Sequence, residues 1–221
     1  MLELPKDVVE FLSAAASVRT PALRINPLSL EQCIADSTRI REIPVAAELG
    51  LIVLDEADDS NPYCLITRGP ASGMVVHFSH DSEPTLAFPD LATFLHALRA
   101  AVRDNRNIDQ LEHHQFSPLP DQPALRSTLH ALLESDDEDA STVLAILFPL
   151  LDPDERDIVL LAASNIDFLI REVAALFVEA HPAVHFRQVA RALSEDAYPQ
   201  VARPALRALQ HIADPTVNDV G

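Results

Sequence analysis

The stretch between residues 51 and 81 most constrains the fold, because it holds three short β-rich runs separated by turn-forming residues. The runs are Leu51–Leu54, Tyr63–Thr67 and Met74–Phe78. Asp, Ser, Asn and Pro precede the second run, and Gly, Pro and Ser precede the third, a pattern typical of neighbouring antiparallel strands. The first run is apolar throughout, which predicts a central strand covered on both faces. In the other two runs, apolar and polar residues alternate only in part, which predicts strands with one face more exposed to solvent.

Helical patterns flank this strand region. Lys6–Ala16 carries an apolar stripe after Pro5, and Phe88–Val102 carries a second stripe that needs an apolar surface to cover. Ser29 is a candidate cap for a helix running to about residue 41, and Pro44 bars its continuation. These patterns predict an α+β domain over residues 1–103. We expect its small antiparallel sheet to be covered by the first and last of these helices.

Three short motifs in this half resemble those of the SUKH superfamily, which joins a fungal cell-wall-synthesis regulator to many bacterial immunity proteins. Leu4-Pro5 with Phe11-Leu12 resembles the family's opening helix, Val76–Asp81 its third-strand signature, and Leu91–Leu95 its closing helix. The likeness covers about residues 3–103. It departs from the pattern in two ways: no glycine follows the first helix, and Ser79 stands where an acidic residue is more usual. The resemblance implies a protein that binds and neutralises a toxin.

The second half changes character. Residues 104–120 are polar and end in Ser-Pro-Leu-Pro, which predicts a linker. Residues 121–221 are expected to form an all-α domain, since amphipathic segments with Pro or Asp at their starts follow one another with little β-branched alternation. The expected helices are Pro123–Glu134, Ala140–Leu151, Pro153–Ala163, Phe168–Ala180, Pro182–Leu193 and Tyr198–Ile212.

A repeat is visible in this helical half. Ile170, Ala174 and Val178 align with Val201, Ala205 and Leu209 at an offset of 31 residues. Paired helices at a regular period indicate an α-solenoid, and the Ile-Arg-x-x-Ala form at residues 170–174 is similar to HEAT repeats. An ordinary six-helix bundle satisfies the same periodicity. The pattern favours the HEAT-like solenoid over the bundle.

The formal net charge of -18 bears on the partner. Residues 1–116 hold nine basic and 17 acidic residues, a net of -8, and residues 117–221 hold seven and 17, a net of -10. Such a surface repels nucleic acid and anionic membrane and favours a protein with a basic surface. No apolar run is long enough to span a membrane, and the N-terminus lacks a signal-peptide layout. We therefore expect a soluble, cytoplasmic protein, and the two cysteines, Cys33 and Cys64, fit a reducing compartment.

No pattern of reactive residues predicts an enzyme, a metal site or a cofactor. His77 and His80 fall on opposite faces of a strand, and His113-His114 are adjacent in a predicted loop. The acidic residues at 152–157 lack the glycine and spacing of a calcium loop and suit the start of a helix. Four glycines are too few for a phosphate-binding loop, and no serine has a nucleophile-elbow context.

Three acidic clusters remain as candidate partner-binding residues, with two ring side chains beside them as contact anchors. They line predicted loops at residues 55–59, 81–83 and 136–139. On this hypothesis, reversing the four acidic residues of the first cluster to lysine slows association and leaves the fold intact, because exposed charges contribute little to stability. The candidate residues are Asp55, Glu56, Asp58, Asp59, Tyr63, His80, Asp81, Glu83, Asp136, Asp137, Glu138 and Asp139.

Two functions follow from different classes. The first is a cytoplasmic immunity protein that blocks a polymorphic toxin. On this hypothesis the toxin acts on nucleic acid, and the acidic immunity protein binds its basic active site. The second is a regulatory or scaffolding protein whose helical half binds a resident cellular protein. The sequence does not separate the two, and it leaves the oligomeric state open.

Overall fold

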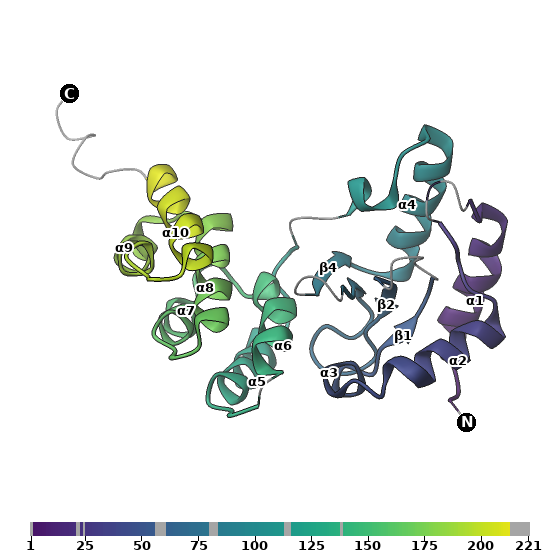
Figure 1. Cartoon of the computed structure of the whole chain (residues 1–221), viewed down its shortest axis with the longest axis horizontal. Coiled ribbons are helices and arrows are strands. Elements are labelled where there is room, and N and C mark those ends of the chain that lie inside the picture. The colour runs from purple at the N-terminus through teal and green to yellow at the C-terminus, as the bar shows by residue number, and fades with distance from the viewer. Residues whose placement is uncertain are drawn as a thin grey trace. The chain divides into compact units, whose positions relative to one another are not determined.

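The computed structural model describes residues 2–20, 23, 25–55, 61–79, 84–112, 116–137 and 139–212 (Figure 1). The chain divides into two compact units, Met1–Phe116 and Ser117–Gly221. The division falls inside the predicted linker of residues 104–120. Most of that segment belongs to the first unit, because α4 runs to Asp104 and a 3₁₀ helix, η3 (Ile108–Leu111), packs on α4.

The first unit is an α+β structure around a four-stranded antiparallel sheet, in agreement with the expected class. The strands follow one another in the order β1-β2-β3-β4, and Cys64 at the centre of β2 lies opposite Val53 and Val76. Its elements are α1 (Lys6–Ala15), η1 (Ala16–Val18), α2 (Leu30–Ile40), α3 (Pro44–Glu48), β1 (Ile52–Val53), β2 (Tyr63–Leu65), β3 (Val75–His77), β4 (Thr85–Phe88), α4 (Leu91–Asp104) and η3.

Strand β4 was not predicted from the sequence, which assigned Phe88 to the start of a helix. Thr85–Phe88 is short and is followed by Pro89, so its pattern is hidden between two breakers. The helix begins only at Leu91, where the Asp90 carboxylate accepts a hydrogen bond from the Thr93 N–H at 2.6 Å. The cap predicted at Ser29 is confirmed: it forms a reciprocal capping box with Gln32.

The prediction that residues 51–54 form a central strand is wrong, because β1 lies at the end of the strand order. All four side chains are nevertheless buried. The outer edge of the strand is covered by groups from α2 and its flanks. Ser37 Oγ accepts from the Val53 N–H at 2.9 Å, and Arg41 Nε donates to the Leu51 carbonyl at 2.9 Å. The edge is thus satisfied by side chains where a further strand would otherwise be needed.

Replacing Ser37 by alanine is expected to destabilise the chain by about 1–2 kcal/mol, because the Val53 N–H would lose its acceptor at a position with no access to water. Chemical denaturation followed by circular dichroism measures the loss. Thr38→Ala is the matched control, since Thr38 is exposed and its hydroxyl donates only to the Ile34 carbonyl of its own helix. Equal losses in the two variants would contradict the edge role of Ser37.

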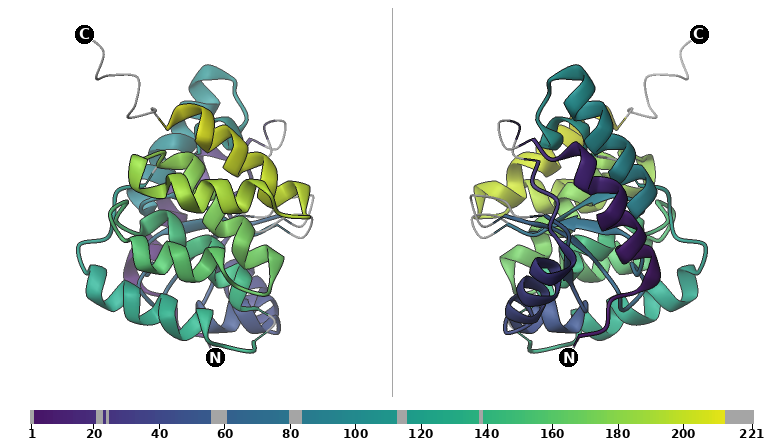
Figure 2. Two further views of the ribbon diagram at one scale, coloured as in Figure 1. Left: turned by 90° about the vertical axis from the view of Figure 1, so that its left-hand side faces the viewer. Right: turned by 90° about the vertical axis from the view of Figure 1, so that its right-hand side faces the viewer.

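An aromatic cluster joins the helices to the sheet. Phe94 of α4 packs between Phe11 of α1 and two sheet residues, with ring centroids 5.5 Å from Phe11, 4.9 Å from Phe88 and 5.1 Å from Tyr63. Helices α1 and α4 lie side by side although 75 residues separate them in sequence (Figure 2, right). These two helices are the ones expected to cover the sheet.

In the described part of the second unit, three helical hairpins stack in two layers (Figure 2, left). Helices α5, α7 and α9 pack successively in one layer, and α6, α8 and α10 in the other. Stacking of this kind lets each hairpin bury its apolar face on its neighbours. The elements are α5 (Gln122–Leu133), α6 (Ala140–Leu147), η4 (Phe148–Leu150), α7 (Arg156–Ala163), α8 (Phe168–Ala180), η5 (Val184–Phe186), α9 (Arg187–Ser194) and α10 (Pro199–His211).

The six expected helices are all found, with shifted ends. Residues 148–150 and 184–186 form 3₁₀ turns, and α7 starts three residues later than predicted. None of the helices in the described ranges is long and apolar enough to cross a membrane.

Candidate functional site

The predicted partner-binding residues that the structure describes are divided between the two units. Asp55 and Tyr63 belong to the first unit, and Asp136, Asp137 and Asp139 belong to the second. The remaining candidates lie outside the described residues, namely Glu56, Asp58, Asp59, His80, Asp81, Glu83 and Glu138.

Asp55 is a structural residue in this fold, contrary to the expectation of an exposed acidic loop. Its side chain is 4% exposed, and its Oδ1 accepts a hydrogen bond from the Tyr63 N–H at 2.7 Å. Its backbone pairs with Pro27 in an isolated antiparallel bridge. The carboxylate therefore joins the end of β1 to the start of β2, and it is not offered to a partner.

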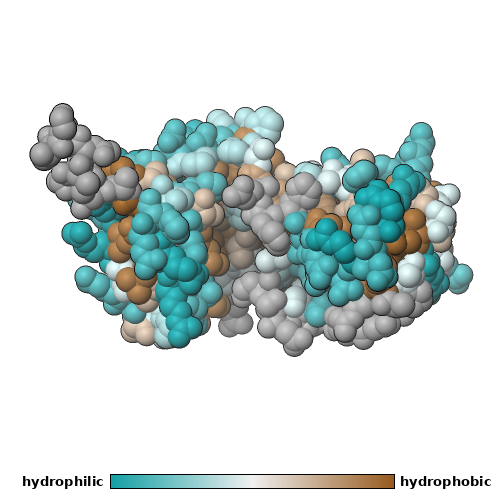
Figure 3. All heavy atoms as spheres, turned by 90° about the horizontal axis from the view of Figure 1, so that it is seen from above, coloured by the Kyte–Doolittle hydropathy of each residue, from teal (hydrophilic) through white to brown (hydrophobic). Residues whose placement is uncertain are grey.

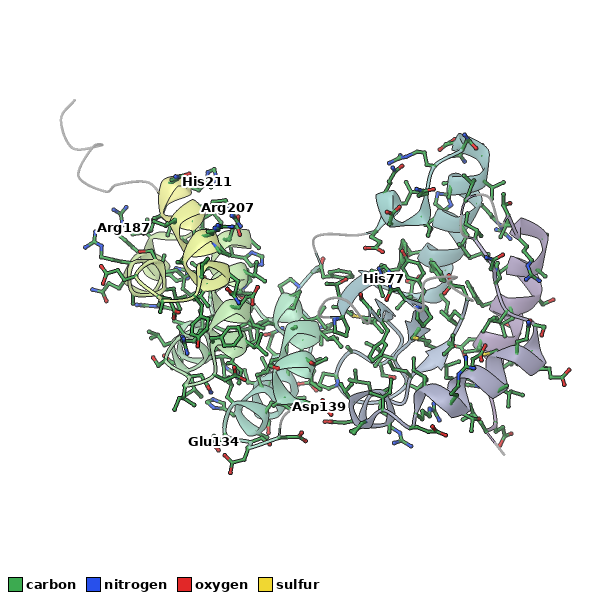
Figure 4. All side chains as sticks on the ribbon, viewed as in Figure 1. His77, Glu134, Asp139, Arg187, Arg207 and His211 are labelled. Carbon is green, nitrogen blue, oxygen red and sulfur yellow. The ribbon has the colours of Figure 1, made fainter. Side chains whose placement is uncertain are left out.

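Tyr63 is also buried, at 3% exposure, so it does not serve as a surface anchor. Its ring stacks on His77 with centroids 4.6 Å apart, and its hydroxyl donates to Glu112 Oε1. His77 Nδ1 lies 3.1 Å from the same carboxylate oxygen. Tyr63, His77 and Glu112 thus form a partly buried polar cluster, with His77 on the sheet (Figure 4).

Burial and neighbouring carboxylates perturb the titration of this region. The hydrogen bond to Glu112 raises the pKa of His77 above 6.5, against an opposing effect of burial. Burial, and then the Glu112 charge, raises the pKa of the Tyr63 hydroxyl, which therefore stays protonated. Burial raises the pKa of Cys64, and that of Cys33 to about 11, so both thiols are held in their unreactive form.

The exposed candidates lie on one edge of the helical unit, which we call the loop edge. It consists of the three loops inside the hairpins, residues 134–139, 164–167 and 195–198. Each loop has the same turn before its second helix: Asp137, Asn165 and Asp196 accept a hydrogen bond from the N–H two residues on, at 3.0, 2.9 and 2.9 Å. Between the first two hairpins, Asn165 Nδ2 donates to the Leu133 carbonyl at the end of α5 at 3.4 Å.

Arg171 of α8 fixes two of these loops together. Its Nε and Nη2 donate to the Asp196 carboxylate at 2.6 and 3.3 Å, and its Nη1 donates to the carbonyls of Asn165 and Ile166 at 3.0 and 2.8 Å. The guanidinium also lies over the Tyr198 ring, 5.9 Å from its centroid. The same bond to Arg171 lowers the pKa of Asp196.

The loop edge presents apolar side chains on this fixed backbone. Ile166 is 98% exposed, and Tyr198 is 43% exposed while stacked on Phe168 at a centroid distance of 4.3 Å. In the space-filling view, brown spots interrupt the hydrophilic surface of the helical unit (Figure 3). A single exposed apolar side chain is ordinary on a protein surface. Ile166 differs in that its backbone is held by hydrogen bonds from Arg171 to its own carbonyl and to that of Asn165.

Charge is unevenly distributed over the helical unit. Eight of its 17 acidic residues fall in the three sequence ranges of the loop edge, where Asp136 and Asp137 are exposed. Basic residues gather on the last hairpin, which carries four arginines between Arg187 and Arg207. Glu134 and Asp139 lie at the α5–α6 end, and Arg187, Arg207 and His211 at the α9–α10 end (Figure 4).

Sequence reasoning missed the residues that organise both sites. Glu112 was placed in a linker, Ile166 fell between two expected helices, and Tyr198 was the first residue of another. Arg171 was noted only as part of a repeat motif. The Asp or Asn that recurs three residues before the start of each second helix was a readable signal for the loop edge. Nothing near Glu112 in the sequence points to Tyr63 or His77.

Among the described residues, no group of three or more His, Cys, Asp or Glu side chains is arranged to hold a metal ion. A comparison of the chain with protein-family models, curated proteins and solved structures found no significant match.

Proposed function

We propose that this chain is a binding protein that works through the loop edge of its helical unit, and that it acts as a cytoplasmic immunity protein against a polymorphic toxin. The observation that carries the binding role is Ile166, 98% exposed on a backbone that Arg171 holds in place. Preorganised apolar anchors bind with less loss of conformational entropy than mobile ones. The immunity role comes from the SUKH-like motifs of the first unit.

The stacked hairpins support a HEAT-like reading of the second unit, in which such repeats present extended binding surfaces. The acidic residues around Ile166 favour a partner with a basic surface, as enzymes that act on nucleic acids have. Charge accelerates the encounter, and the desolvated apolar contact slows dissociation. The alternative is a regulatory or scaffolding protein that presents the same edge to a resident cellular protein.

Ile166→Ala is expected to weaken binding about tenfold, mainly through faster dissociation, because the variant removes a central apolar contact. The measurement is surface plasmon resonance against the purified product of the neighbouring reading frame. Leu176→Ala is the matched control, since Leu176 is an exposed apolar residue on α8, nine residues beyond the 164–167 loop. Equal losses in the two variants would remove the loop edge from the proposal.

The acidic residues of the loop edge are expected to act on the association rate constant. Replacing Asp136 by lysine should slow association at low salt, with a smaller effect once the Debye length falls below roughly 8 Å. Asp137 is kept, because its carboxylate accepts the Asp139 N–H within the loop. If the chain neither binds the neighbouring product nor protects cells that express it, the immunity role fails and the scaffolding alternative stands.

A further inference from the structure

In the first unit, the Glu112 carboxylate attaches the segment after α4 to the sheet. Glu112 directly follows η3, and its Oε1 receives both the Tyr63 hydroxyl and His77 Nδ1. The Glu112 side chain is only 12% exposed and that of His77 is 28% exposed. The same segment is also held by the buried Ile108 side chain and by Arg106, whose Nη2 donates to the Gln110 carbonyl at 3.0 Å.

His77 is the member of this cluster that changes charge near neutral pH. The charged and titratable groups that act on it are Glu112 beside η3 and Asp55 at the end of β1. The Tyr63 ring from β2 stacks on the imidazole. A backbone hydrogen bond with Asn61 also raises the pKa of His77. On β4 its partner is Thr85, which does not titrate.

We propose that Tyr63, His77 and Glu112 form a pH-sensitive latch, which holds residues 108–112 on the sheet while His77 is protonated and loosens when the proton leaves. A hydrogen bond between two charged groups is stronger than one with a neutral imidazole. Loss of the proton therefore weakens one of the two attachments of Glu112 and leaves the Tyr63 bond in place.

The direction of the pH effect follows from the raised pKa of His77. The attachment contributes fully below 6.5, where His77 is charged in both the folded and the unfolded chain. The contribution is lost as the pH rises through the higher pKa of the folded state. The latch is thus closed in acid and loosens toward alkaline pH.

The experiment is an NMR pH titration of the intact, isotopically labelled chain. The His77 ring signal should titrate with a midpoint above 6.5, and the amide signals of Ile108 and Glu112 should shift with the same midpoint. In Glu112→Gln the His77 midpoint should fall to 6.5 or below, and the amide shifts should lose their pH dependence. Hydrogen exchange at residues 108–112 should then rise about tenfold, as expected for loss of a charged hydrogen bond.

Two further variants separate the His77–Glu112 ion pair from the Tyr63 hydroxyl and from general effects of pH. Tyr63→Phe removes one donor but leaves the ion pair, so the His77 midpoint should remain above 6.5. His96→Gln changes an exposed histidine on α4 and should leave the titration of residues 108–112 unchanged. A His77 midpoint at or below 6.5 in the parent chain would overturn the latch, as would amide signals of 108–112 that do not follow it.

Discussion

Replacing Asp55 by lysine is expected to unfold the first unit, with a loss of at least about 3 kcal/mol. The side chain is 4% exposed, and its carboxylate accepts the Tyr63 N–H. Lysine would leave that donor without its acceptor and would place an ammonium group among apolar side chains. The measurement is chemical denaturation of the full chain, with circular dichroism following the loss of structure.

Two controls separate burial from charge. Asp136→Lys makes the same charge change on the exposed loop edge and should alter stability by no more than about 0.5 kcal/mol. Asp55→Asn keeps a side-chain oxygen that accepts the Tyr63 N–H, so its loss should be smaller than that of lysine. A stable Asp55→Lys variant would restore the exposed acidic loop that the sequence suggested.

The second large effect is expected at Arg171. Arg171→Ala removes the charged pair with Asp196 and the two hydrogen bonds to the 164–167 loop, at a side chain only 17% exposed. We expect a loss of about 2–3 kcal/mol, since hydrogen bonds to charged groups are stronger than neutral ones. The third hairpin should then unfold at a lower denaturant concentration than the rest, as nearest-neighbour coupling in helical stacks predicts.

A double-mutant cycle with Asp196→Ala tests the pairing directly. The two losses should be non-additive, because each variant breaks the same interaction. The control is Arg203→Ala, an exposed arginine on α10. Because Arg171 lowers the pKa of Asp196, the contribution of the pair should be present at neutral pH and lost as acid protonates the folded carboxyl group. Additive losses, or a loss unchanged by acid, would show that Arg171 stabilises the chain without the Asp196 pair, through the loop carbonyls and packing.

Asp55 and Asp136 show what local sequence can and cannot predict about the exposure of an acidic residue. Both stand in runs of acidic residues, and composition gives each the same expectation of an exposed loop. One is buried against a strand and the other is exposed on a hairpin loop. The difference depends on Tyr63 and Pro27, partners that lie eight and 28 residues away in sequence.

Local chemistry determined the class and the element types of this protein. Helical periodicity identified the six helices of the second half, and the capping chemistry at Ser29 marked the start of α2. Short β-rich runs between turn-forming residues marked three of the four strands. These signals work because caps, turns and amphipathic stripes depend on residues within a few positions of one another.

Tertiary structure alone decided which polar groups meet. It placed β1 at the edge of the sheet under α2, brought Glu112 to Tyr63 across 49 residues, and joined Arg171 to Asp196 across 25. Such pairings depend on how the elements pack, so the residues next to one partner in the sequence do not predict the other partner. Ile166 follows the same rule, because only the folded stack leaves its side chain outside while Arg171 holds its backbone in place.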